Sequence, residues 1–384
     1  QRKYKNPHMA IMGTTGSGKT VIEQCMATRM RRKHIATTII APLKGHEYAR
    51  AVKAMGGQFI RISTGSPHCI NVMEIRPTDN SANRLLDGEM EEESCLSMKI
   101  DSLLIFFSII MPEMTNIEEQ LLDEALVKTY GDFGITNDNR SLLDPDHPGR
   151  FKRMPILGDL YKNLRDNPKA DRLAIVLNRF VGGSARAFNN QTNVDLSNPY
   201  TVIDLSYLKK KLLSAGMFIA TDLIWDLAKQ NRLKQKAIVI DEVWQLIGSS
   251  SSPQAAEYLV EMAKIGRAYN TSIIFATQDI NDFFSLENGK YGKAILSNSK
   301  TKIILNMESH EAERCGEVLG LTATEVHKIK NFERGYGLLS CNGNNIAVRF
   351  QASAMELSLI TTDPEELQKL VEGKNREIMG KAGP

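Results

Sequence analysis

A glycine-rich segment near the start of the chain, GTTGSGKT at residues 13–20, constrains the fold more than any other feature. It satisfies the G-x-x-x-x-G-K-[ST] pattern, known as Walker A. In this pattern, glycines let backbone N–H groups converge on phosphate oxygens, and the following helix adds partial positive charge. A short apolar strand at 8–12 and a helix at 19–32 are predicted around it, as a P-loop requires. The alternative is a glycine loop that merely turns a strand into a helix.

Individual positions of this motif have expected roles. Lys19 is expected to reach the β- and γ-phosphate oxygens of ATP, and Thr20 to offer its hydroxyl to Mg²⁺. ATP and Mg²⁺ are therefore the predicted ligands. The residues predicted to bind nucleotide are Gly13, Thr14, Thr15, Gly16, Ser17, Gly18, Lys19 and Thr20.

A second element, Asp241-Glu242, directly follows the apolar run AIVI at 237–240 and fits a Walker B motif. A carboxylate at the carboxyl end of a buried parallel strand lies where open α/β sheets bind ligands. Asp241 is predicted to hold Mg²⁺, and Glu242 to act as the general base that polarises the attacking water. An Asp-Glu pair can also be a solvated turn, but the buried strand before it favours the catalytic interpretation.

Gln278 follows another apolar run, SIIFA at 272–276, and is predicted to sense the γ-phosphate and position water. The alternative is a simple cap of a helix or turn. Arg267, between the second and third elements, is predicted to serve as an arginine finger for a neighbouring subunit, with an ordinary surface arginine as the alternative. Arg334 and Arg349 are weaker candidates for this role.

Strand-like runs alternate with helical segments, which predicts an α/β fold with a mostly parallel central sheet flanked by helices. Residues 1–80 and 188–360 are assigned to this nucleotide-binding domain. Residues 81–187 have the pattern of an all-helical inserted subdomain, with a capping box at Thr115 and Glu118. A polar C-terminal helix is predicted for 361–384, and the segment 342–345 is predicted to connect a β-hairpin.

Composition restricts the partners. The net charge is only +3, so no global attraction to nucleic acid is implied, although a local basic groove is compatible with it. Five scattered cysteines predict reduced thiols of a cytosolic protein. The longest apolar run, 103–111, is far shorter than the roughly 20 residues that span a bilayer. The chain begins with Gln1 and reaches its P-loop strand within about ten residues, so we expect a piece of a longer protein, in which any membrane anchor or partner-docking domain would lie outside this sequence.

The order of these motifs resembles the C-terminal ATPase domain of the conjugative type IV secretion ATPases, the VirB-four, TrbE and TraC class. Asp241 lies 221 residues after Thr20, and the gap holds the helical insertion. This family belongs to the HerA/FtsK branch of RecA-like motors. One departure is Ala41 before Pro42, where the family often has an acidic residue. The segments that carry the resemblance are 6–9 (NPHM), 13–20, 45–48 (GHEY), 70–71 (IN), 203–205 (IDL), 240–244 (IDEVW), 276–278 (ATQ) and 334–338 (RGYGL).

The resemblance implies a RecA-like P-loop ATPase at the cytoplasmic face of the inner or cell membrane. It also implies self-association, as a hexamer, and partners in the secretion channel that include a coupling protein. Membrane association would come only through partners or through a missing N-terminal region. Two alternatives remain open: a DNA-translocating motor of the HerA/FtsK or coupling-protein type, and a nucleotide-gated assembly scaffold with little turnover.

Overall fold

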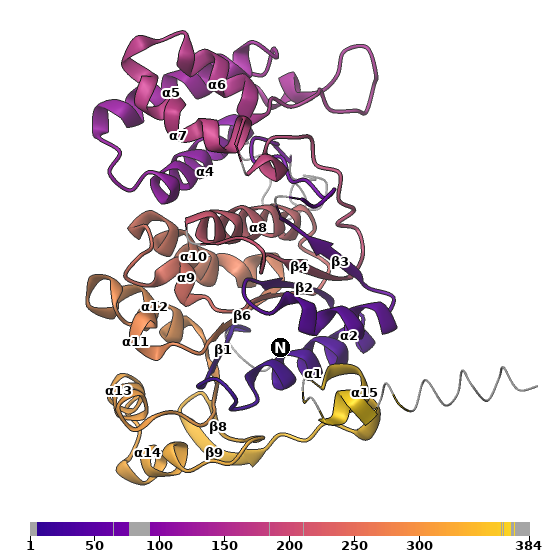
Figure 1. The fold of residues 1–384 in the computed structure, drawn as a ribbon, viewed down its shortest axis with the longest axis vertical. Helices are drawn as coiled ribbons and strands as arrows, with labels where there is room; N and C mark the ends of the chain where they lie inside the picture. Colours follow the sequence, from indigo (N-terminus) through magenta and orange to yellow (C-terminus); the bar gives the residue numbers. More distant parts are fainter. Residues whose placement is uncertain are drawn as a thin grey trace, which may run out of the picture.

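The computed structural model describes residues 6–63, 65–76, 93–183, 185–209, 211–361, 363, 365–369 and 372. Strands within these residues form one sheet in the order β3-β4-β2-β5-β6-β1-β7-β8-β9 (Figure 1). All neighbouring pairs from β3 to β7 are parallel, whereas β8 and β9 add antiparallel at one edge. The predicted α/β fold with a mostly parallel sheet is confirmed. The strand bounds are β1 (Met9–Met12), β2 (Ala36–Ala41), β3 (Gln58–Arg61), β4 (Tyr200–Asp204), β5 (Lys236–Ile240), β6 (Thr271–Thr277), β7 (Thr301–Ile304), β8 (Tyr336–Cys341) and β9 (Asn344–Arg349).

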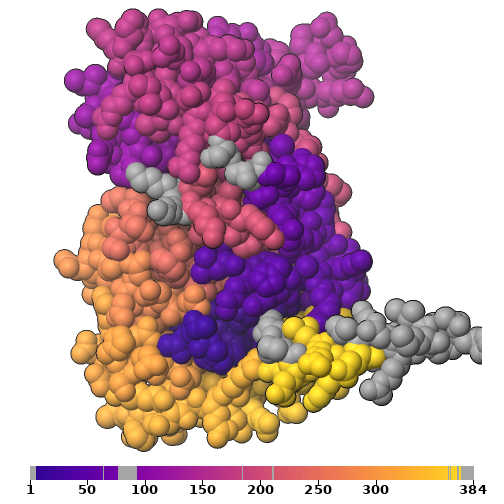
Figure 2. All heavy atoms as spheres, viewed as in Figure 1, coloured from indigo at the N-terminus to yellow at the C-terminus, as the bar shows by residue number. Residues whose placement is uncertain are grey.

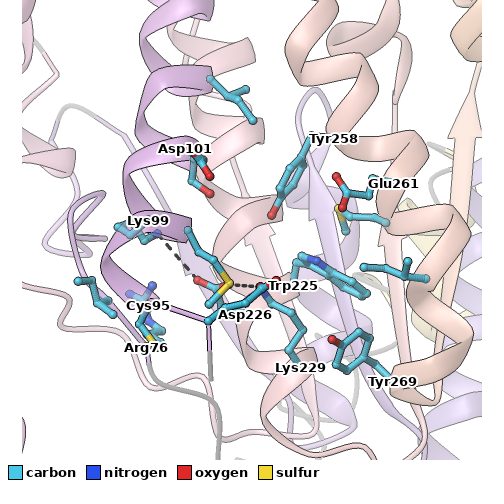
Figure 3. Close-up of a pocket in the computed structure, with 17 residues that line it drawn as sticks. Arg76, Cys95, Lys99, Asp101, Trp225, Asp226, Lys229, Tyr258, Glu261 and Tyr269 are labelled. Carbon is cyan, nitrogen blue, oxygen red and sulfur yellow. Dashed lines mark ion pairs between the residues drawn. The ribbon is translucent and has the colours of Figure 1, made fainter. Parts of the chain in front are cut away.

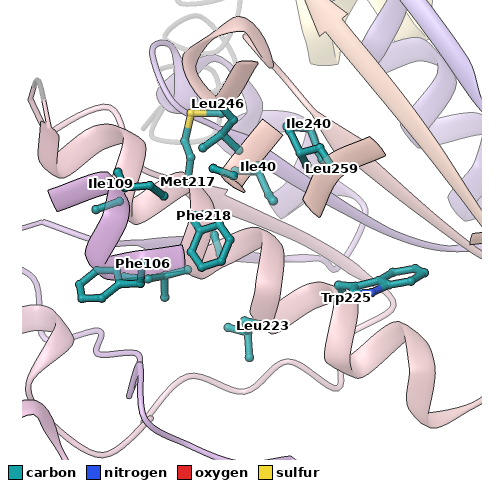
Figure 4. Packing of buried hydrophobic residues seen from close by; sticks show 14 of the residues in the cluster. Ile40, Phe106, Ile109, Met217, Phe218, Leu223, Trp225, Ile240, Leu246 and Leu259 are labelled. Atoms are coloured by element: carbon teal, nitrogen blue, oxygen red, sulfur yellow. The ribbon is translucent and has the colours of Figure 1, made fainter. Parts of the chain in front are cut away.

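Helices cover both faces of the parallel part, which explains why its central strands are almost continuously apolar. Successive side chains of a strand point to opposite faces, so Ile39 packs on the α1 side and Ile40 on the α8 side. Figure 4 shows Ile40 and Ile240 in the second of these two cores. The helices around the sheet are α1 (Lys19–Arg32), α2 (Ala49–Ala54), α8 (Lys211–Gln230), α9 (Trp244–Ile247), α10 (Pro253–Ile265), α11 (Ile280–Phe283), α12 (Lys290–Asn298), α13 (Ser309–Leu319), α14 (Ala323–Lys330) and α15 (Ala354–Ile360), with 3-10 turns η1 (Gly45–Tyr48), η5 (Gly266–Tyr269) and η6 (Leu286–Gly289).

The segment between the neighbouring strands β3 and β4 is helical and forms the upper part of the molecule in Figure 1. Its helix α4 is mostly apolar and packs on α8, where Phe106 and Phe218 belong to one core (Figure 4). None of the described helices is both long and apolar enough to cross a membrane. The elements of this segment are α4 (Cys95–Ile110), α5 (Asn116–Gly131), η2 (Asn139–Leu142), α6 (Leu157–Arg165), η3 (Pro168–Ala170), α7 (Asp171–Val181) and η4 (Arg186–Phe188).

Most predicted local structure agrees with the observed elements. The helix predicted at 19–32 matches α1, and Thr115 and Glu118 form both hydrogen bonds of a capping box at the start of α5. The hairpin connection is shorter than predicted, because Asn344 already pairs with Cys341. Only Asn342 and Gly343 form the turn, both with positive φ, as a tight type I′ connection requires.

The predicted domain boundaries remain predictions. The first boundary, at residue 81, lies outside the described residues, and the second falls within η4. The predicted C-terminal helix 361–384 also lies largely outside them, although 365–369 are helical.

The last described helix, α15, returns to the N-terminal part of the chain. Arg29 of α1 binds both carboxylate oxygens of Glu356 at 2.8 and 2.9 Å. Arg50 of α2 donates to the backbone oxygens of Leu359 and Thr361. Figure 2 shows this segment, in yellow, against the indigo N-terminal region.

A buried histidine anchors the start of β1 to β6. His8 is fully buried, and its Nδ1 accepts a hydrogen bond from the backbone N–H of Ile273 at 2.9 Å. The ring lies so close to Gly266 that a Cβ there would be 2.7 Å from its Cε1. Burial lowers the pKa of His8 to about 4.

Because the unfolded chain protonates His8 below about pH 6.5 and the folded protein does not, the free energy of unfolding should fall as the pH drops toward 4. We expect a loss of about 1.4 kcal/mol per pH unit below 6.5 from this group. Urea unfolding of the wild type and of His8→Gln at pH 7, 6 and 5 checks this. The stability difference between the two proteins should shrink as the pH falls; parallel profiles would contradict it.

Candidate nucleotide-binding site

The P-loop follows β1 and has the backbone of an anion site. Gly16 and Gly18 adopt positive φ angles of 87° and 98°, where other residues are strained. A Cβ on Gly13 would lie 2.7 Å from Leu305. Helix α1 begins at Lys19 with no side-chain cap and no acidic residue in its first turn. Its first N–H groups therefore have no capping partner and can bind phosphate oxygens.

Lys19 is buried and joins the P-loop to the acidic pair after β5. Its Nζ lies 2.7 Å from Asp241 Oδ1 and 2.6 Å from Glu242 Oε1. Burial alone would lower the pKa of Lys19, but the charges of Asp241, Glu23 and Glu242 raise it above its usual value. The ammonium group is therefore held fully charged at the centre of the site.

Glu242 is oriented by three groups. Its Oε2 accepts hydrogen bonds from Trp244 Nε1 at 2.8 Å and from the backbone N–H of Gln278 at 3.3 Å, while Lys19 binds the other oxygen. Its φ of 49° is unusual for a residue other than glycine, as is often found at functional sites. Burial, and then the charge of Asp241, raise the pKa of Glu242, which makes it a better proton acceptor.

The three predicted elements meet in one pocket because β1, β5 and β6 are parallel and their carboxyl ends share an edge of the sheet. Gln278 follows β6, and its Oε1 accepts a hydrogen bond from Thr15 Oγ1 at 2.9 Å. The residues that line the pocket are Thr14, Thr15, Gly16, Gly18, Lys19, Thr20, Val21, Leu43, Lys44, Glu47, Asp241, Glu242, Gln278 and Arg334.

Strand direction decides which arginine reaches this pocket. Arg267 is exposed and lies in η5, just before the parallel strand β6, and so at the sheet edge opposite the P-loop. Arg334 precedes β8, which is antiparallel, so the start of β8 lies at the P-loop edge and Arg334 lines the pocket. Arg349 ends β9 with its guanidinium over the Tyr336 ring and is not among the pocket-lining residues.

Several residues at the site were not predicted to belong to it. In the sequence, Trp244 and Tyr48 belong only to segments that carry the family resemblance, and no motif marks Glu23. Glu47 lies in the pocket, and burial raises its pKa. An acidic side chain therefore enters from the segment after β2 although Ala41 occupies the strand end. The sequence signal for these residues is the segment 45–48, because its last two residues, Glu47 and Tyr48, both lie at the site.

The donor set suits Mg²⁺. Thr20 and Asp241 offer the hard oxygen ligands that this ion prefers. Two acidic side chains, of Asp241 and Glu242, bind the single Lys19, so a divalent cation would balance an excess of negative charge. Among the described residues no ready-made cluster of three or more His, Cys, Asp or Glu side chains could hold a metal. Mg²⁺ is usually held by one or two protein oxygens together with substrate phosphates, and Thr20 and Asp241 would supply the protein oxygens here.

A larger cavity of about 380 Å³ lies elsewhere, among α4, α8 and α10 (Figure 3). Both lysines that line it are bound by carboxylates: Lys99 binds Asp222 at 2.8 Å, and Lys229 binds Asp226 at 2.9 Å. It contains no glycine loop, so the phosphate-binding chemistry belongs to the smaller pocket at the P-loop.

Comparisons with known proteins agree with this geometry. The solved structure of VirB4 of Thermoanaerobacter pseudethanolicus has a TM-score of 0.80 and 26% identity, covering 91% of this chain and 90% of that chain. The unbound bacterial conjugative coupling protein TrwBdeltaN70 has a TM-score of 0.58 and 14% identity, covering 92% and 86%. TrwB in complex with ADP and Mg²⁺ has a TM-score of 0.57 and 13% identity, covering 92% and 86%. No curated protein sequence matches this chain.

The family comparison is the most direct. The central domain of helicase HerA matches residues 2–101, which contain the P-loop. The TraG P-loop domain matches residues 160–370, more than half of the chain, including Asp241, Glu242 and Gln278. The family expected from the sequence is confirmed: the chain belongs to the TraG P-loop domain family, and its fold is that of VirB4-type P-loop ATPases.

Proposed function

We propose that this chain is an ATPase that powers substrate transfer or assembly in a type IV secretion or conjugation system. The observation that carries the proposal is the buried contact of Lys19 with Asp241 and Glu242 beside an uncapped P-loop helix. The similarity to VirB4 and to the conjugative coupling protein TrwB supports the biological setting.

Nucleotide binding would exchange the partners of Lys19. The triphosphate oxygens would take the ammonium group from the two carboxylates, since Lys19 begins the helix whose N–H groups also face the phosphates. Asp241 and Thr20 would then be available to Mg²⁺, which when bound neutralises charge on the β- and γ-phosphates. Glu242 would become free to accept a proton.

Glu242 and Gln278 would then carry out the hydrolysis step. Glu242, oriented by Trp244, accepts a proton as water attacks the γ-phosphorus, and the bond to the bridging oxygen breaks. Gln278 lies beside Glu242 and Thr15 and is suited to position that water. The products are ADP and inorganic phosphate.

We further propose that the protein acts as an oligomer, with a coupling protein and other channel components, at the cytoplasmic face of the membrane. The exposed position of Arg267 at the edge opposite its own pocket supports a role in a neighbouring subunit. Arg334, which lines the pocket of its own chain, is suited to contact phosphates directly.

Lys19→Ala and Glu242→Gln should separate binding from chemistry. We expect Lys19→Ala to lose hydrolysis and most ATP affinity, because the phosphate oxygens lose their buried cation. Glu242→Gln should still bind ATP but hydrolyse it about 10²- to 10⁴-fold more slowly, because the amide cannot accept the proton. Phosphate release and equilibrium binding measure the two effects. The exposed Glu257→Gln on α10 is the matched control.

Undiminished turnover in both site variants would refute the ATPase assignment. The same assay separates the alternatives. Turnover stimulated by DNA and lost steeply with salt would favour a DNA motor. ATP binding without turnover at any protein concentration would favour a scaffold.

Trp244 should report the partner exchange of Lys19 directly. The chain has two tryptophans, and Trp225 lies away from the pocket, against Tyr269. In Trp225→Phe, addition of Mg·ATP should change the fluorescence of Trp244, because the carboxylate that accepts its N–H loses Lys19. In Trp244→Phe the remaining signal should stay constant. A constant signal in Trp225→Phe together with a changed signal in Trp244→Phe would contradict the proposed exchange of partners.

Mixing variants should separate the two arginines. Arg267→Ala and Lys19→Ala should each be inactive alone but recover activity when mixed, because one subunit supplies the intact pocket and the other the intact finger. Arg334→Ala mixed with Lys19→Ala should not recover, since Arg334 serves its own pocket. Turnover of mixtures at increasing ratios measures this. No recovery in the first mixture would rule out Arg267 as a finger.

A further inference from the structure

The P-loop helix carries an acidic side chain for which the proposed hydrolysis has no role. Glu23 lies one helical turn after Lys19, and its side chain is fully buried. Its Oε1 is 3.9 Å from Lys19 Nζ and has no hydrogen-bond partner. A buried carboxylate with one oxygen unsatisfied costs stability that an apolar side chain would avoid.

Its other oxygen is held by a second buried side chain. The Tyr48 hydroxyl donates to Glu23 Oε2 at 2.7 Å, and Tyr48 itself is fully buried at the end of η1. This turn is fixed against β4, because a Cβ on Gly45 would collide with the Asp204 carboxylate. Tyr48 therefore reaches Glu23 from a turn that packs closely against β4, and not from the P-loop itself.

We propose that the Glu23–Tyr48 pair positions Lys19. When nucleotide draws the Lys19 ammonium group away from Asp241 and Glu242, the pair holds this group in line with the phosphates. The inference rests on the proposed function, since it assumes that Lys19 exchanges partners. Asp241 would then hold the metal, and Glu242 would bind the attacking water. Glu23 would remain as the neighbouring acid with one oxygen, Oε1, still without a hydrogen-bond partner.

The charges around Glu23 support its role as the partner of Lys19 after nucleotide has bound. Burial, and then the charge of Asp241, raise the pKa of Glu23 to about 8, while Lys19 opposes the shift. Neutralisation of Asp241 would remove one of the three causes that raise the pKa of Glu23, which are burial and the charges of Asp241 and Glu242, and would leave the attraction of Lys19. The unsatisfied Oε1 would then gain the ammonium group as its partner.

Glu23→Gln and Tyr48→Phe test the inference in the full chain. Gln keeps the acceptor for Tyr48 but not the charge, and Phe removes the hydroxyl that orients Glu23. We expect both to lower kcat, Glu23→Gln about tenfold, with ADP affinity changed less than about threefold, because Lys19 acts most strongly on the γ-phosphate in the transition state. Tyr200→Phe, which also removes a buried hydroxyl, is the matched control, because the Tyr200 hydroxyl has no hydrogen-bond partner.

A second measurement does not depend on hydrolysis. In the nucleotide-free protein, the unfolding free energies of Lys19→Met, Glu23→Gln and the double variant should be non-additive, because the two side chains interact. Normal kcat in Glu23→Gln and Tyr48→Phe, with additive stabilities, would overturn the inference and leave the ATPase proposal standing. Non-additive stabilities in a protein whose wild type hydrolyses no ATP would refute the ATPase proposal and retain the Glu23–Lys19 coupling.

Discussion

The structure is organised around one buried ammonium group. Lys19 has little contact with solvent, so its charge must be balanced by nearby acids, and these come from α1 and from the end of β5. The contact spans 222 residues of sequence and joins the P-loop to a strand two positions away in the sheet. Removing either Lys19 or its acidic partners would leave an uncompensated buried charge. Because the Lys19 ammonium group needs negatively charged partners, the site is also suited to phosphates, which can replace the carboxylates.

Much of this arrangement could be predicted, because its elements follow buried strands. The P-loop, Asp241 and Gln278 each follow a strand that corresponds to an apolar run in the sequence, and parallel strands place such residues at one edge. Applying that rule requires only the order of strands and motifs along the sequence. The direction of an added edge strand requires more than sequence order, so the entry of Arg334 into the pocket of its own chain could not be derived from the sequence. The reversal at β8 is a tertiary feature, set by its pairing with β7.

The residues that support Lys19 were harder to find. Glu23 and Tyr48 are 25 positions apart and meet only because α1 and η1 pack on the same face of the sheet. Nothing in their local sequence indicates the contact. Short helices such as α12 and α13 were not predicted either, because brief amphipathic segments between polar turns resemble loops.

The helical segment between β3 and β4 has a consequence for how this fold can diversify. Since the two strands are parallel neighbours, the segment leaves the sheet at the carboxyl end of β3 and crosses over to re-enter it at the opposite edge, at the start of β4. The entropy of closing such a loop grows only logarithmically with its length, so additions there cost little. Helix α4 is the exception, because its apolar side chains cover α8. We therefore expect additions to the exposed loops between α5 and α7 to be tolerated more readily than changes to the α4 side chains that pack on α8.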